Sequence, residues 1–147
     1  MEIRYAKKSD ARTLWEMRNC KAIREVSTNT ARIPYENHLK WFHEAIKQND
    51  TLLFIIKDNV GSVRIDRIEN VGVVSIYLLP KAQGKGLGVK SLNLAVRLAF
   101  EKWDIKKIKA FIREDNENSI KAFQKVGFTR NNRAIGVPKD HLQFEVV

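Results

Sequence analysis

The chain has 147 residues, of which 44% are hydrophobic and 30% charged, with a formal net charge of +10. This length and composition suit one globular domain, expected over residues 1–147. The longest uncharged apolar stretch, residues 71–79, falls far short of the roughly 18 residues that suggest a membrane span. Residues 1–5 lack a signal-peptide core, and a lone cysteine, Cys20, allows no internal disulfide. We therefore expect a cytoplasmic protein with no membrane partner.

The excess of basic residues raises the question of a nucleic-acid partner. Lysines and arginines are spread along the chain, and the densest group lies where a predicted helix ends and a strand begins: Lys102, Lys106, Lys107 and Lys109. Lysines at that place complement the helix dipole. The sequence carries no RNA-binding aromatic signature and no helix-turn-helix pattern. Phosphorylated small molecules explain the charge at least as well, so a nucleic-acid partner is disfavoured.

The first part of the chain predicts a short strand followed by a helix. The strand covers residues 2–5, and Ser9 or Asp10 can cap the helix. The apolar residues that share one face of this helix are Leu14, Met17 and Ile23. A polar stretch, residues 27–30, separates it from a second helix.

The second helix begins near Pro34, because proline is tolerated in the first turn of a helix. The residues on its inward face are Leu39, Phe42 and Ile46. Two strands of a hairpin follow, over residues 51–57 and 61–66, about the turn pair Asp58–Asn59.

A strand, a helix and a second strand form the next unit, over residues 71–79, 86–103 and 107–113. A right-handed crossover makes the two strands parallel. Asn116 caps a short fourth helix that ends at Gly127. Two further strands close the sheet, over residues 129–133 and 141–147. The expected fold class is therefore α/β (α+β) with about four helices.

The loop Gln83-Gly84-Lys85-Gly86-Leu87-Gly88 lies between the buried strand and its helix. A glycine loop that enters a helix leaves backbone N–H groups free, and these donors, with the positive end of the helix dipole, suit a phosphate or pyrophosphate. A tight turn that binds nothing is the alternative, but such a turn needs only one glycine. A dinucleotide fingerprint fails because Gly88 comes one residue early. A P-loop fails because Val89 stands where its second glycine belongs.

The spacing that does fit is Q-x-x-G-x-G, with Gln83, Gly86 and Gly88 as fixed members. A second segment, N-E-N-S-I-K-A-F-Q-K-V-G-F, covers residues 116–128. The two segments resemble the acyl-CoA signature and the N-x-x-(A/S)-I-x-x-(Y/F)-x-K-x-G-F segment of the GNAT superfamily of N-acyltransferases, and the resemblance covers at least residues 52–130. It implies direct transfer of an acetyl group from acetyl-CoA to an amine, without a metal. It also implies a GNAT-like fold, whose mixed, mostly antiparallel sheet contains a parallel strand pair that splays around CoA.

The resemblance assigns the CoA site residue by residue. The pantetheine arm would pair with the backbone of Ile76, Tyr77 and Leu78. The other expected CoA-binding positions are Gln83, Gly84, Lys85, Gly86, Leu87, Gly88, Val89, Asn116, Ser119 and Phe123.

The chain departs from the family pattern at the two positions whose side chains usually transfer protons. The tyrosine that usually serves as the acid corresponds to Phe123, and the glutamate base of some peptide acetyltransferases corresponds to Phe111. In one alternative another group supplies the proton; Ser119 is a catalytic candidate, although it also suits a helix cap or a CoA contact. In a second the thiolate leaves unprotonated, stabilised by a helix amino terminus. In a third the domain binds CoA and catalyses poorly.

The amino-terminal third reads R-N…R-x-x-S-x-N…I-x-x-x-x-H-x-x-W-F from Arg18 to Phe42. This arrangement resembles a GNAT branch that acetylates amino groups on nucleotide-linked deoxy-sugars, as in pseudaminic-acid-type pathways. It makes Arg18 and Arg24 candidates to clamp a diphosphate, although both also suit exposed helix charges. Trp41 is a candidate substrate wall or a core residue. His38 is a candidate base or substrate ligand, or else a surface or capping histidine.

Three functions remain open on the sequence. The first is N-acetylation of a nucleotide-linked amino sugar; the inert pair Phe111 and Phe123 favours a weakly basic amine over a lysine side chain, whose pKa is about 10.4. The second is N-acetylation of protein or peptide α-amines or of another small amine, of which polyamines suit a basic chain less well. The third is a CoA-binding or nucleic-acid-binding module without catalysis. The oligomeric state is also open, a homodimer included.

Overall fold

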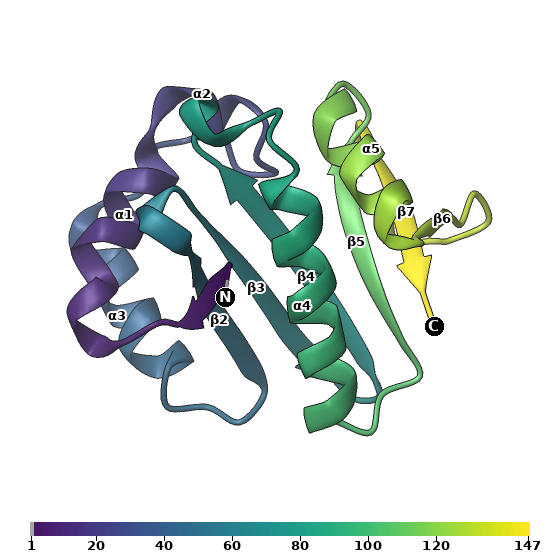
Figure 1. Cartoon of the computed structure of the whole chain (residues 1–147), viewed down its shortest axis with the longest axis horizontal. Helices are drawn as coiled ribbons and strands as arrows, with labels where there is room; N and C mark the ends of the chain where they lie inside the picture. Colours follow the sequence, from purple (N-terminus) through teal and green to yellow (C-terminus); the bar gives the residue numbers. More distant parts are fainter. Residues whose placement is uncertain (1) are drawn as a thin grey trace.

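Seven strands and five α-helices make up the computed structural model, which describes residues 2–147 (Figure 1). The strands are β1 (Ile3–Tyr5), β2 (Thr51–Ile56), β3 (Gly61–Ile68), β4 (Val71–Leu78), β5 (Lys107–Arg113), β6 (Thr129–Arg130) and β7 (His141–Val146). The helices are α1 (Ala11–Asn19), α2 (Lys21–Glu25), α3 (Tyr35–Ala45), α4 (Leu87–Lys102) and α5 (Glu117–Val126).

The strands form one sheet in the order β1-β2-β3-β4-β5-β7-β6. Neighbouring strands run antiparallel except β4 and β5, which run parallel. The expected mixed, mostly antiparallel sheet with one parallel pair is therefore confirmed. The hairpin between β2 and β3 is confirmed as well, and Asp58 and Asn59 at its turn both adopt positive φ angles.

Helices cover both faces of the sheet, because the side chains of a strand point alternately to its two sides. The larger core lies under α4 and α5 and includes Ile65, Leu92, Ala95, Ala99 and Phe123. The smaller core lies under α1 and α3 and includes Leu14, Met17, Phe42, Leu53 and Ile55. In Figure 1, α4 runs along the middle of the sheet, with α1 and α3 on the β2 side and α5 beside β5 and β7.

The parallel strands are paired over only three positions, which join Val71 to Lys107, Gly72 to Ile108 and Val73 to Lys109. Beyond them β4 stays paired with β3 as far as Leu78, while β5 stays paired with β7 as far as Arg113. The two strands diverge from there, as Figure 1 shows, so the expected splay is confirmed. In residues 2–147, the β5-facing edge of β4 has no strand partner beyond Val73.

The first predicted helix is in fact two helices, so there are five rather than about four. Cys20 separates α1 from α2 with an extended backbone (φ −56°, ψ 133°). Contacts of Asn19 stabilise this break: its side-chain amide donates to the Ile33 carbonyl (2.8 Å) and accepts from the Ile33 N–H (2.7 Å). Its backbone carbonyl accepts from Arg24 Nε (3.1 Å). Ile23 therefore lies on a different helix from the apolar face of α1.

The predicted cap of the first helix is wrong. The Asp10 carboxylate accepts the N–H of Lys7 (2.7 Å) instead of an N–H of α1. The same carboxylate accepts two hydrogen bonds from the Arg4 guanidinium, at 2.8 and 3.0 Å. This pairing lowers the pKa of Asp10 and ties β1 to the start of α1.

The caps of α5 are confirmed. Asn116 Oδ1 accepts the N–H of Ser119 (3.2 Å) at the start of the helix. Gly127 ends it in the left-handed region, with φ at 109°. The strand that follows is shorter than expected, because β6 ends at Arg130.

Replacing Asn116 with alanine removes the cap of α5. We expect the free energy of unfolding in urea to fall by about 1 kcal/mol, because the N–H of Ser119 loses its acceptor. Asn93→Ala is the control: Asn93 is exposed within α4, where alanine is the better helix former, so we expect no loss. Equal effects of the two substitutions would contradict the capping role.

Candidate active site

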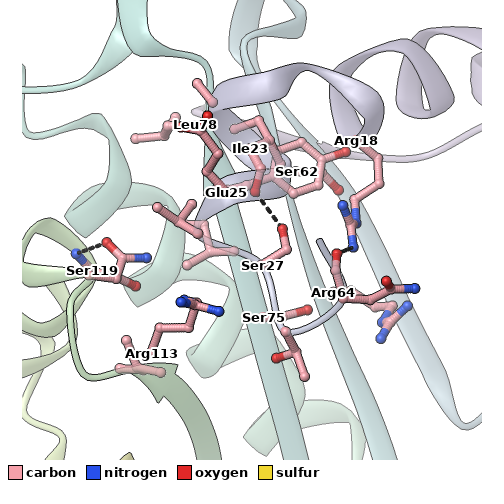
Figure 2. Close-up of a pocket in the computed structure, with 18 of the residues that line it drawn as sticks. Arg18, Ile23, Glu25, Ser27, Ser62, Arg64, Ser75, Leu78, Arg113 and Ser119 are labelled. Atoms are coloured by element: carbon pink, nitrogen blue, oxygen red, sulfur yellow. Dashed lines mark hydrogen bonds between the residues drawn. The ribbon is translucent and has the colours of Figure 1, made fainter. Parts of the chain in front are cut away.

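The divergence of β4 and β5 opens a cleft with a volume of about 830 Å³. Its walls come from β3, β4 and β5, from α1 to α3, and from the starts of α4 and α5 (Figure 2). The loop between α2 and α3 closes one side. Within it, Ser27 Oγ donates to the Ile23 carbonyl (2.6 Å), and Thr28 Oγ1 lies 3.1 Å from Nε2 of His141 on β7. The Thr28–His141 bond joins this loop to β7.

The glycine loop enters α4 through two left-handed residues. Gly84 and Gly86 have φ angles of 77° and 76°, which L side chains rarely adopt. The first hydrogen bond of α4 runs from the Lys90 N–H to the Gly86 carbonyl (3.2 Å). The amides of residues 87–89 therefore have no acceptor within the helix. Such amides, at the positive end of a helix dipole, suit a pyrophosphate.

Gly88 lies close to the end of β4. A Cβ there would lie 3.1 Å from Leu78 Cδ1, so the Leu78 side chain would have to shift to admit it. The Gln83 side chain adds a second tie, because its Nε2 donates to the Leu78 carbonyl (3.1 Å) and its Oε1 accepts from Asn118 Nδ2 (3.4 Å). The loop, the end of β4 and the start of α5 are thus held together. Asn118 was not anticipated from the sequence.

The cleft brings together most of the residues predicted to bind CoA. Those that line it are Ile76, Tyr77, Leu78, Gln83, Gly88, Asn116, Ser119 and Phe123. The others are not among the lining residues and belong to the adjoining loop and first turn of α4: Gly84, Lys85, Gly86, Leu87 and Val89.

Side chains alternate along β4 and give the cleft two sides. Ile76 and Leu78 pack against the core under α4, whereas Tyr77 packs against the core of α1 and α3. The Tyr77 hydroxyl lies 3.5 Å from the Leu14 carbonyl, and burial raises the pKa of Tyr77, so the phenol stays protonated. We call the second side the α1–α3 compartment; it is lined by Arg18, His38, Trp41, Ser62, Arg64 and Tyr77.

The two phenylalanines at the usual proton-handling positions both line the cleft. Phe123 is 2% exposed, and its ring meets Phe128 edge-on with a centroid distance of 4.9 Å. The Phe111 ring on β5 lies 5.3 Å from Lys109 Nζ. Neither ring can donate or accept a proton, so other groups must handle protons in this cleft.

His38 is buried, with 6% of its surface exposed, so the surface alternative is wrong. Its ring stacks on Phe42 and tilts against Trp41, at centroid distances of 6.2 and 5.5 Å. Burial lowers the pKa of His38; a hydrogen bond to the Ala11 backbone opposes this shift, and the charge of Arg18 adds to it. The imidazole is therefore neutral at pH 7. Its Nε2 is buried and has no hydrogen-bond partner in residues 2–147.

The structure separates the two candidate arginines. Arg18 lines the cleft; its Nη2 donates to the Asn29 carbonyl (2.8 Å), and its buried Nη1 has no partner in the described part of the chain. Arg24 is not among the lining residues, and its Nε donates to the Asn19 carbonyl at the α1–α2 junction. Trp41 lines the cleft with 37% of its surface exposed, so it is not a core residue.

Sequence reasoning missed Arg64, the Tyr77 side chain and Arg113 as lining residues. The Arg64 guanidinium carbon lies 5.1 Å from the Trp41 ring centroid, and its Nε lies 3.0 Å from Asp66 Oδ2. Alternation along β3 puts Arg64 on the face opposite its apolar residues, which is a signal the sequence does contain. Only the pairing with β4 reveals that this face borders a cleft.

Positive charge predominates in the cleft. Arg18, Arg64 and Arg113 line it against a single carboxylate, Glu25, which pairs with Lys21 at 3.9 Å. Within residues 2–147, no group of three His, Cys, Asp or Glu side chains could hold a metal ion. No helix in that range has the length and apolar character needed to cross a membrane.

The divided parallel pair and the free amides at the start of α4 suit an extended ligand that carries a pyrophosphate, as acetyl-CoA does. A family model described as "Acetyltransferase (GNAT) domain" matches residues 1–129, and the chain therefore belongs to the GNAT acetyltransferase family. The enzyme class expected from the two sequence segments is confirmed.

Two relatives and one solved structure show how far the similarity extends. An N-acetyltransferase 9-like protein of Caenorhabditis briggsae is 35% identical over 83 residues, which cover 55% of this chain and 40% of that protein. Acetyltransferase PseH of Campylobacter jejuni is 24% identical over 102 residues, 68% of this chain and 65% of that protein. The chain thus spans less than two thirds of either relative. Spermidine N-acetyltransferase from Vibrio cholerae, solved with CoA and spermine, shares the fold with a TM-score of 0.82 at 17% identity, covering 98% of this chain and 93% of that one.

Gly86→Asp should abolish CoA binding. The substitution places a side chain at a positive φ and a negative charge beside the free amides of α4. Gly136→Asp is the matched control, because Gly136 has the same φ of 76° and open space around it but lies between β6 and β7 and not at the start of α4. Calorimetry should show CoA binding to the control and none to Gly86→Asp. Wild-type affinity in folded Gly86→Asp would refute the role of the loop.

Proposed function

We propose that the chain transfers the acetyl group of acetyl-CoA to the primary amine of a small molecule, a nucleotide-linked amino sugar. The observation that carries the proposal is the cleft, which connects the glycine loop with the α1–α3 compartment through the gap between β4 and β5. A thioester in the gap and an amine in the compartment would meet there, and such positioning supplies much of the rate of a two-substrate reaction.

The CoA side of the cleft would act through backbone groups. Acetyl-CoA supplies an acetyl group activated as a thioester. The free edge of β4 at residues 76–78 offers N–H and C=O groups that can pair with the amides of the pantetheine arm. The amides of residues 87–89 would bind the pyrophosphate, and Asn116 and Ser119 lie beside them at the start of α5.

His38 is the base we propose for the acceptor amine. A base must be unprotonated at working pH, and the lowered pKa of His38 keeps Nε2 free to accept a proton. Nε2 would take a proton from the ammonium group, directly or through a water molecule. The amine nitrogen then attacks the acetyl carbon, the carbon–sulfur bond breaks, and the nitrogen loses its second proton to water, which leaves a neutral amide. Since Phe123 offers no proton, the sulfur leaves as a thiolate near a helix amino terminus, with Ser119 as the alternative donor.

Two observations support a nucleotide-linked amino sugar as the acceptor. The segment from Arg18 to Phe42 resembles the branch that acts on such sugars, and the similarity to PseH agrees with that branch. Arg18 and Trp41 of this segment both line the α1–α3 compartment. A peptide α-amine is the second candidate, because its pKa of about 7.7–8.0 allows a weak base such as His38 to remove its proton.

Acetyl-CoA consumption with a panel of acceptors tests the proposal. The panel contains nucleotide-linked amino sugars, short peptides and spermidine, and the expected result is the highest kcat/KM on an amino sugar. A higher value on a peptide would establish the second candidate. CoA binding without turnover on any amine would instead establish a CoA-binding module that does not catalyse.

His38→Ala should lower kcat most at high pH. Wild-type His38 is unprotonated only above its pKa, which lies below the ordinary 6.5, so its contribution is present above that pKa and disappears on acidification. The deficit of the variant should therefore shrink as the pH falls. His43→Ala, on the same helix but outside the cleft, serves as the control with no deficit. A deficit of His38→Ala that stays constant from pH 5 to 9 would exclude the base role.

Phe123→Tyr restores a hydroxyl at the position where the family usually has one. We expect the variant to fold, to bind CoA normally and to keep kcat within a few-fold of the wild-type value, or to exceed it if the hydroxyl protonates the thiolate. Single-turnover kinetics and thermal unfolding check this. A large loss of kcat with CoA affinity intact would show that the buried Phe123 ring shapes the acceptor site instead.

A further inference from the structure

Arg18 and Arg64 reach the α1–α3 compartment from different elements. Arg64 lies on β3 directly opposite Ser75 of β4, two positions along from the pair formed by Ser62 and Tyr77 and therefore on the same face of the sheet. Arg18 comes from the last turn of α1. Figure 2 shows the two arginines on the same side of the cleft, with Arg113 and Ser119 on the other side, toward β5 and α5.

The two guanidinium groups have one carboxylate between them, the Asp66 carboxylate that pairs with Arg64, so a net positive charge remains. Arg18 forms no ion pair within residues 2–147, and in that range its side chain hydrogen-bonds only to the carbonyl of Asn29. Arg64 lies beside Asp66 on its Nε side, without hydrogen-bond geometry, and Asp66 is not among the lining residues. Burial lowers the pKa of Arg18, and the positive charge of Arg64 adds to this shift. An anion placed between the two groups would relieve both the burial cost and the repulsion.

Neighbouring groups hold this pair in place. The Arg64 guanidinium lies over the Trp41 indole, at 5.1 Å from the ring centroid. The Arg18 guanidinium is fixed by its bond to the Asn29 carbonyl, which leaves the buried Nη1 free. Beside them, the Tyr77 hydroxyl keeps its proton; it lies 3.5 Å from the Leu14 carbonyl and beside the Ser62 hydroxyl. The Ser62 hydroxyl already donates to the Phe54 carbonyl at 2.7 Å.

We propose that Arg18 and Arg64, with the Tyr77 hydroxyl as a third donor, form a subsite for an anionic group on the acceptor molecule. The acceptor is then an amine that carries a phosphate or a carboxylate within the same small molecule. The inference rests on the proposed acetyl transfer and adds the charge that the acceptor must carry. Neutral amino sugars lack the group that the subsite binds, and a polycation such as spermidine would meet the same two positive charges.

Matched pairs of acceptors test this subsite by binding as well as by turnover. Glucosamine is compared with glucosamine 6-phosphate, with its carboxylate relative glucosaminic acid and with a UDP-linked amino sugar. Affinity is measured by calorimetry on the CoA-bound protein, so that the result does not depend on catalysis. We expect the anionic members to bind at least about tenfold more tightly than glucosamine, as one charge-assisted contact allows. The ranking of the three anions distinguishes a phosphate, a carboxylate and a diphosphate.

Arg64→Gln should remove this preference. We expect its affinity for the anionic acceptors to fall about tenfold or more, with CoA affinity and glucosamine binding unchanged. Arg64→Lys keeps the charge and should retain a larger share of the preference, and Arg97→Gln, exposed on α4, should change nothing. Thermal unfolding checks that each variant is folded.

The outcomes separate the subsite from the acetyl transfer on which it rests. Preferential binding of the anionic acceptors that is lost in Arg64→Gln, but without acetylation of any of them, would support the subsite and refute the proposed function. The subsite is overturned if the wild-type protein binds the neutral and the anionic member of each pair with equal affinity. Weak binding of both members counts as this outcome. An equal loss of affinity for neutral and anionic acceptors in Arg64→Gln would also overturn the subsite, because that pattern marks a purely structural arginine.

Discussion

The parting of β4 from β5 after Val73 is the constraint on which the rest of the site depends. Two strands that separate lose the backbone hydrogen bonds between them, and a fold tolerates this loss only where other interactions keep both strands in place. Here each strand keeps its other partner, β3 for β4 and β7 for β5, and the cores on both faces of the sheet remain closed. The opening therefore lies inside the sheet, within reach of both helical layers.

The two sides of the opening present positive charge of different kinds. On the α4 side the charge is that of backbone amides, which are fixed by the left-handed Gly86 and by the contact of Gly88 with Leu78. On the α1–α3 side it is carried by the guanidinium groups of Arg18 and Arg64. Amides at a helix start are rigid and weakly charged, whereas guanidinium groups are fully charged and adaptable. The rigid amides suit a ligand that does not vary, and the adaptable guanidinium groups suit a second ligand whose shape decides specificity.

Features that depend on a few adjacent residues were predictable from the sequence. The cap at Asn116 and the end of α5 at Gly127 each involve one helical turn, and the parallel pair follows from the order of strand, helix and strand. The break at Cys20 was not predictable, because its stabilising contacts run from Asn19 to the distant Ile33. The place of Arg64 in the cleft likewise depends on the register of β3 against β4. In both cases the deciding contact joins segments that are far apart in the chain.

An unpaired strand edge is ordinarily a template on which other polypeptides assemble into larger sheets. The free edge of β4 faces a cleft instead: β5 stands across from it, α4 and α5 lie over one face, and the loop between α2 and α3 lines the other side. A foreign strand would need room for side chains on both of its faces, which these elements occupy. A narrow ligand made of amide and methylene groups has no such side chains and needs no such room. The enclosure thus keeps backbone donors and acceptors available to a small molecule while denying them to the strands that would seed aggregation.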